Sequence, residues 1–105
     1  GKARREVIYV DDVADACVYF MKKRIKENII NIGTGKDYTI KQYAKILVSE
    51  IYPNRKVKII FDTSKPNGTP RKLLNVSLAK KYGWVAKNKL RNSIQETYKK
   101  FAKII

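Results

Sequence analysis

The pattern of apolar and polar positions along the chain predicts four helices. In three stretches, residues 11–24, 39–52 and 89–103, apolar side chains return every three or four positions, which is the period of a helix with one buried face. A shorter helix is expected to begin at Ser77 and to stop at Gly83, because a glycine lets the chain leave a helix in a left-handed turn. Trp84 follows directly and is expected to pack into the end of the core.

Polar residues predict how two of these helices begin. Asp11 or Asp12 is expected to cap the first helix, since a short carboxylate accepts hydrogen bonds from free backbone amides and faces the positive end of the helix dipole. Thr39 and Gln42 have the spacing of a capping box for the second helix, and Pro53 should end it.

Three segments rich in β-branched or alternating apolar residues are predicted strands: residues 5–10, 28–32 and 56–61. The glycine-rich residues 33–36 between two elements are predicted to form a turn. A phosphate-binding P-loop needs a longer spacing between its glycines and a Ser or Thr after the lysine, where this chain has Asp37. The pattern therefore predicts a small mixed α/β domain of about four helices and three to four short strands.

Residues 64–75 form a stiff segment in which two prolines bracket Asn67 and Gly68. The segment carries three cations, Lys65, Arg71 and Lys72. Cations held close to a rigid turn are typical of an anion-binding loop, but a plain connection with solvated lysines would have the same composition. From the residues alone, both readings stay open.

Charge raises the question of an anionic partner. The net charge is +15; the first 62 residues hold 13 basic and 8 acidic side chains, and the last 43 hold 11 basic and one acidic. Nucleic acid, a membrane surface or a phosphorylated small molecule would suit this imbalance, and so would a plain solvated surface. Apolar runs are far shorter than the roughly 20 residues of a membrane span, so no membrane partner is expected. A single cysteine permits no internal disulfide and indicates a cytoplasmic setting.

Two segments near the amino end resemble the extended short-chain dehydrogenase/reductases. Residues 5–16, Arg-Glu-Val-Ile-Tyr-Val-Asp-Asp-Val-Ala-Asp-Ala, are similar to an Arg-(Asp/Glu)-Phe-Ile-x-Val-Asp-Asp segment of that superfamily, and residues 31–35, Asn-Ile-Gly-Thr-Gly, to its next hallmark. Residues 61–76, Phe-Asp-Thr-Ser-Lys-Pro-Asn-Gly-Thr-Pro-Arg-Lys-Leu-Leu-Asn-Val, resemble the corresponding segment of GDP-L-fucose synthases. The likeness runs along nearly the whole chain.

The resemblance implies the fold and the activity of a larger enzyme. Members of the family are NADP(H)-dependent homodimers that convert GDP-4-keto-6-deoxy-D-mannose to GDP-L-fucose by epimerisation and reduction. They have a Rossmann domain and a smaller carboxyl-terminal substrate domain, and residues 1–105 resemble the latter. The chain begins on a glycine without an initiator methionine, so we expect a piece of a longer protein. Cofactor and catalytic residues are then expected outside it, with no bound cofactor, no metal site and no activity in the fragment alone.

Three residues match family positions that contact the substrate. Arg5 corresponds to an arginine that contacts the substrate's phosphates, and Lys72 to a lysine of the substrate pocket. Asn67 stands where the family usually has a substrate-contacting Asp, so its charge differs from the pattern. Of the two other cations, Arg71 is expected to support Lys72, and Lys65 to lie on the surface.

Two alternative functions are carried forward. The first is the same domain of a sister enzyme, such as a UDP-sugar epimerase or a dTDP-sugar dehydratase, against which the Gly-Thr-Pro-Arg-Lys motif of residues 68–72 argues. The second is a basic nucleic-acid-binding module. The chain has no RRM, KH or zinc signature, and its aromatic residues fall mainly at core spacing, so no nucleic-acid partner is expected.

Overall fold

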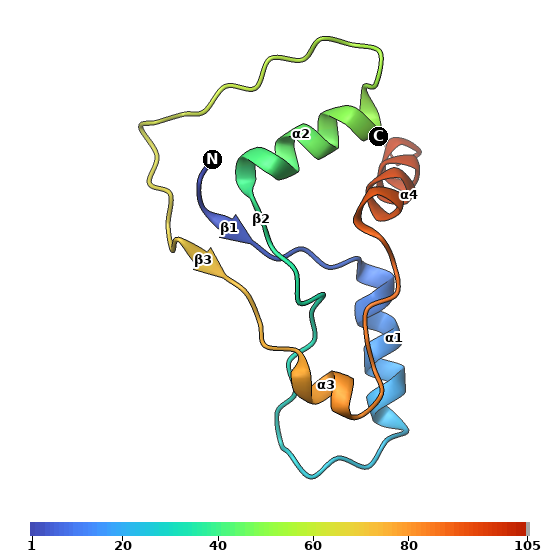
Figure 1. Cartoon of the computed structure of the whole chain (residues 1–105). Coiled ribbons are helices and arrows are strands. Elements are labelled where there is room, and N and C mark those ends of the chain that lie inside the picture. Colours follow the sequence, from blue (N-terminus) through green and yellow to red (C-terminus); the bar gives the residue numbers. More distant parts are fainter. Residues whose placement is uncertain (105) are drawn as a thin grey trace.

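The computed structural model describes residues 1–104 as four helices and a small sheet (Figure 1). The expected α/β class, with about four helices and three to four short strands, is confirmed. In chain order the elements are β1 (Arg4–Arg5), α1 (Val10–Met21), β2 (Tyr38–Thr39), α2 (Ile40–Ile51), β3 (Arg71–Lys72), α3 (Ser77–Lys81) and α4 (Leu90–Ala102). No helix within residues 1–104 is long and apolar enough to cross a bilayer.

The sheet has the order β2-β1-β3, with β1 antiparallel to β2 and parallel to β3. The strand predictions were wrong for most residues. Of the segment 5–10, only Arg5 lies in a strand, and residues 28–32 and 56–61 form no strand. The segment after α2 instead runs as a long arc away from the sheet before it returns to β3 (Figure 1). Apolar alternation was misleading because a strand also needs backbone hydrogen bonds to a neighbouring strand, and neither 28–32 nor 56–61 forms any within residues 1–104.

The helix ends follow the prediction only in part. The capping box of α2 is present: Gln42 N donates to Thr39 Oγ1 and Thr39 N to Gln42 Oε1. Gly83, at φ +94°, ends α3 as expected. Ser77, however, is not a cap but the first residue of α3, and its N–H donates to Asn75 Oδ1 at 3.0 Å.

Asp11 and Asp12 do not cap α1, contrary to the prediction. The helix begins at Val10, and no side chain caps it. Asp12 is only 2% exposed, and its carboxylate accepts hydrogen bonds from Lys87 N, Asn88 N and Asn88 Nδ2 at 2.8–3.2 Å. A buried carboxylate is stable where backbone amides satisfy it, so Asp12 holds a segment that lies far away in sequence.

The buried core lies between α1 and α3. Its centre consists of Ala16, Ala79 and Trp84, with half-buried apolar side chains around it. Trp84 is 3% exposed, and its Nε1 donates to Asp15 Oδ2 at 2.9 Å, so the indole is buried with its polar atom satisfied. The expected packing role of Trp84 is confirmed.

The apolar stripe of α1 is covered only in part. Ala16 is buried and Phe20 packs at the edge of the core, whereas Cys17 is exposed and Met21 is 84% exposed. The helical period therefore predicted the element correctly, but the described chain does not cover all of the face that it marks.

Candidate functional site

The register of the sheet brings the predicted site residues Arg5 and Lys72 together. In the parallel pairing of β1 with β3, Arg4 stands opposite Arg71 and Arg5 opposite Lys72. Side chains of successive strand residues leave on opposite faces. The sheet therefore sorts four cations into two pairs, Arg4 with Arg71 on one face and Arg5 with Lys72 on the other.

Asp37, which directly precedes β2, forms ion pairs with both Arg4 and Arg71. Arg71 Nε donates to Asp37 Oδ2 at 2.7 Å, and Arg4 Nη2 to Asp37 Oδ1 at 3.1 Å. The carboxylate is nearly buried, with 4% of its side chain exposed. The hydrogen bonds from Arg71 and then Arg4 lower the pKa of Asp37 below its usual value. Arg71 is thus engaged in an ion pair inside the chain.

Arg5 organises the loop that precedes β3. Its Nη1 donates to the carbonyl oxygens of Arg4 and Thr69, both at 2.7 Å, and its Nη2 approaches the carbonyl of Asn67 at 3.4 Å. Its Nε–H and one further N–H form no hydrogen bond within residues 1–104, and no acidic side chain in that range pairs with it. A guanidinium so placed can still donate to an anion.

The turn between the two prolines lies against this guanidinium. Gly68 has φ +72°, a conformation that favours glycine, and a Cβ there would stand 3.3 Å from Arg5 Nη2. Asn67 meets Arg5 through its backbone carbonyl, and its side chain forms no hydrogen bond within the described residues. Of the three predicted site residues, Arg5 and Lys72 are therefore cross-strand partners, and Asn67 joins them through the loop.

Glu6 is a site-building residue that the sequence reasoning did not single out. Its carboxylate accepts hydrogen bonds from Gly35 N at 2.6 Å, Thr34 Oγ1 at 3.3 Å and Leu74 N at 3.2 Å. A Cβ on Gly33 would come within 2.7 Å of it, which accounts for the glycine. Its position directly after Arg5 in the motif of residues 5–16 was the signal that could have identified it from the sequence.

Glu6 also explains why the glycine turn is no phosphate loop. The Gly35 amide, which a phosphate would need, is already bonded to the Glu6 carboxylate. A second anion beside that carboxylate would be repelled. The interpretation of residues 33–36 as a structural turn is therefore supported by a contact.

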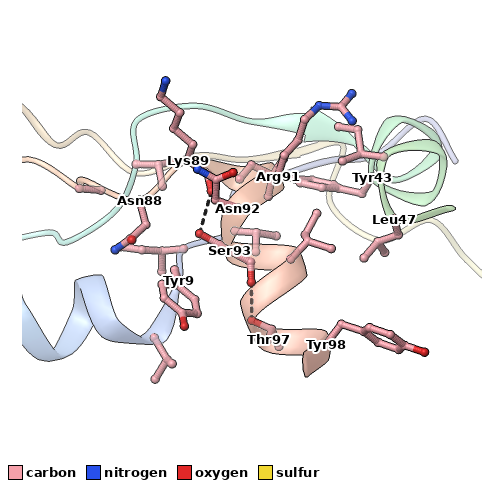
Figure 2. A pocket seen from close by; sticks show the side chains of 18 of the residues that line it. Tyr9, Tyr43, Leu47, Asn88, Lys89, Arg91, Asn92, Ser93, Thr97 and Tyr98 are labelled. Carbon is pink, nitrogen blue, oxygen red and sulfur yellow. Dashed lines mark hydrogen bonds between the residues drawn. The ribbon is translucent and has the colours of Figure 1, made fainter. Parts of the chain in front are cut away.

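A concave region lies between α2, α4 and residues 7–10, away from the Arg5–Lys72 pair. This open groove has a volume of about 1080 Å³, and Figure 2 shows Tyr9, Tyr43, Leu47 and Tyr98 around it. Three of its hydroxyls bond inside the chain: Ser93 donates to Lys89 O, Thr97 to Ser93 O, and Tyr43 to Arg5 O at 2.8 Å. The lining of the groove is predominantly apolar, so the groove is a weaker candidate for an anion site than the Arg5–Lys72 pair.

Comparisons with known proteins agree with the motifs. The sequence model of the "NAD dependent epimerase/dehydratase family" matches residues 1–33. A putative GDP-L-fucose synthase 2 from Arabidopsis thaliana is 42% identical over 98 residues, which cover 93% of this chain and 29% of that protein. The chain thus spans about a third of the length of the curated relatives it matches.

Solved structures share the fold. A GDP-mannoheptose C4 reductase from Campylobacter jejuni, solved with NADP bound, is 32% identical with a TM-score of 0.81, covering 97% of this chain and 32% of its own. A UDP-glucose 4-epimerase from Thermotoga maritima, solved with UDP-glucose, is 28% identical with a TM-score of 0.85, covering 99% of this chain and 33% of its own. The chain is therefore similar to GDP-L-fucose synthases over nearly all of its length, and residues 1–33 match the model of the NAD-dependent epimerase/dehydratase family.

Proposed function

We propose that residues 1–105 are the carboxyl-terminal, nucleotide-sugar-binding domain of an NADP(H)-dependent enzyme that converts GDP-4-keto-6-deoxy-D-mannose to GDP-L-fucose. The observation that carries this proposal is the register of β1 against β3, which sets Arg5 beside Lys72 while Asp37 engages the neighbouring Arg4 and Arg71. Similarity to GDP-L-fucose synthases supports the choice of substrate.

A diphosphate suits the two cations on the open face. A guanidinium offers several N–H donors to phosphate oxygens, and a lysine adds a compact second charge. Arg5 is already ordered by its bonds to the loop, so binding an anion would cost little side-chain entropy. Asn67 would face the same ligand with an amide in place of the carboxylate that the family motif usually has.

Cofactor and catalysis belong, in this proposal, to the remainder of a longer polypeptide. The glycine turn of residues 33–36 does not fit a dinucleotide phosphate, because Glu6 uses the Gly35 amide. Neither Tyr-x-x-x-Lys spacing in the chain lies wholly on a helix. Tyr19 is in α1 but Lys23 follows the end of that helix, and the Tyr52 to Lys56 spacing runs through Pro53 after α2 has ended. We therefore assign NADP(H) binding, the catalytic residues and the homodimer contacts to the remainder, and expect residues 1–105 alone to be inactive.

Lys72→Ala is the sharpest test of the binding site, because Arg5→Ala would also release the loop. We expect the substitution to weaken GDP binding by about tenfold, as loss of one charge-assisted contact should. Lys65→Ala is the matched control, since it removes a cation of the same loop that lies outside the sheet, and it should change the affinity less than twofold. Calorimetric titration of the chain with GDP measures both; equal losses in the two variants would overturn the site.

The sister-enzyme alternative is separated by the choice of nucleotide. The fold is shared with a UDP-glucose 4-epimerase, so the fold alone does not select the base. Titration with GDP and UDP in parallel distinguishes them: tighter binding of GDP supports the proposal, and tighter binding of UDP favours the alternative. In the complete enzyme, Arg5→Ala and Lys72→Ala should raise the substrate KM and leave NADPH binding unchanged.

A further inference from the structure

Two carboxylates stand on either side of the Arg5–Lys72 pair, and each joins all three segments of the sheet. On one side, Asp37 precedes β2 and bonds to Arg4 of β1 and Arg71 of β3. On the other side, Glu6 follows β1 and bonds to the turn before β2 and to Leu74 N, two residues beyond Lys72. We call Asp37 and Glu6 the clamp carboxylates.

The sheet between them is too short to hold its own register. Only two residue pairs join β1 to β3, where strands in globular proteins usually have about five residues. A slip of one residue would exchange the faces, and Arg71 would then stand where Lys72 stands. Apolar packing cannot prevent this slip, because both residues of β3 are exposed.

We propose that the clamp carboxylates are positioning residues that set Lys72 beside Arg5, so that the two cations reach one anion together. This inference rests on the proposed function for its ligand, but not for its geometry. Asp37 suits the role because a single nearly buried carboxylate holds guanidiniums of both neighbouring strands. Glu6 suits it because its two oxygens bond to different strand ends.

The first test is a mutant cycle on GDP affinity in the 105-residue chain. Asp37→Asn should weaken GDP binding about fivefold or more, and Glu6→Gln should do the same. In a Lys72→Ala background, Asp37→Asn should cause less than a further twofold loss, because the position of an absent lysine no longer matters. If Asp37→Asn weakened GDP binding by the same factor with and without Lys72, Asp37 would not act through Lys72, and the proposal would be overturned.

Glu50→Gln is the matched control. Glu50 is also held by an arginine, Arg91, and by Gln95, and it links α2 to α4 away from the sheet. If Asp37 were only one more stabilising ion pair, Glu50→Gln would lower GDP affinity as much as Asp37→Asn does. We expect the control to change it less than twofold, and Asp37→Glu to recover at least part of the loss.

A second measurement does not depend on any ligand. The Arg4 amide donates to Pro70 O at 2.8 Å, immediately before the β1–β3 pairs. Asp37→Asn should speed hydrogen exchange of this amide about tenfold, and Glu50→Gln should leave it unchanged. If the parent chain did not bind GDP, the proposed function would fail, but hydrogen exchange would still test whether Asp37 holds the strand register. Faster exchange in Asp37→Asn supports that role, and unchanged exchange overturns it.

Discussion

The motif of residues 5–16 places charged residues in two regions, Arg5-Glu6 and Asp11-Asp12, and their charged groups form different kinds of contacts. At the Asp12 end, one buried carboxylate accepts three N–H groups from residues 87 and 88, and no cation takes part in these bonds. At the Arg5 end, cations outnumber carboxylates, and Arg5 keeps donors that the described chain does not use.

This difference separates structural residues from residues that are available to a ligand. A buried group whose hydrogen bonds are all made inside the chain has no capacity left for a partner. Asp12 is of this kind, and so is the Asp37 carboxylate, whose oxygens accept hydrogen bonds from Arg4 and Arg71. Arg5 and Lys72 are ordered by the same sheet but retain free donors, which is why we place the anion there. The predictions below test that contrast.

The largest effect is expected at the Asp12 end. Asp12→Ala should lower the free energy of unfolding by about 3 kcal/mol, because two backbone amides and the Asn88 side chain lose a charged acceptor. Asp11→Ala is the control: its carboxylate is exposed and lies 3.7 Å from Lys100, so the loss should stay below about 0.5 kcal/mol. Urea denaturation of both variants measures the difference. Equal losses would remove the structural role assigned to Asp12.

A smaller effect is expected at the core that lies beside this end. Trp84→Phe keeps an aromatic ring but removes the Nε1 donor to Asp15, so the unfolding free energy should fall by about 1 kcal/mol. GDP affinity should not change, since Trp84 lies in the α1–α3 core and not in the sheet. A weaker affinity in a folded Trp84→Phe variant would contradict the separation of the two ends.

The smallest effect is expected on the stability of the chain at acid pH. Arg71 and Arg4 lower the pKa of Asp37, so its contribution to stability is present above the pKa of the unfolded chain, about 4, and is lost as the pH falls through the lower folded value. Urea midpoints measured from pH 5 down to pH 2 should therefore fall less steeply in Asp37→Asn than in the parent chain. Identical profiles would argue against the ion pairs at Asp37.

The sequence by itself predicted the helices and the resemblance to a family. Helical periodicity, the Thr39–Gln42 box and the stop at Gly83 depend on residues a few positions apart, so a linear reading finds them. The motif of residues 5–16 likewise named relatives that the comparisons then identified. It also marked Arg5 and Lys72 as candidate site residues, but it did not show that they are cross-strand partners.

The tertiary structure decided the strands, the register and the roles of the carboxylates. Apolar runs at 28–32 and 56–61 read as strands, yet the paired residues are the polar ones of β1 and β3. Asp12 meets Asn88 across 76 positions, and Glu6 meets Leu74 across 68. Such contacts form only when distant segments fold together and satisfy each other's charges and amides, and no local pattern records them.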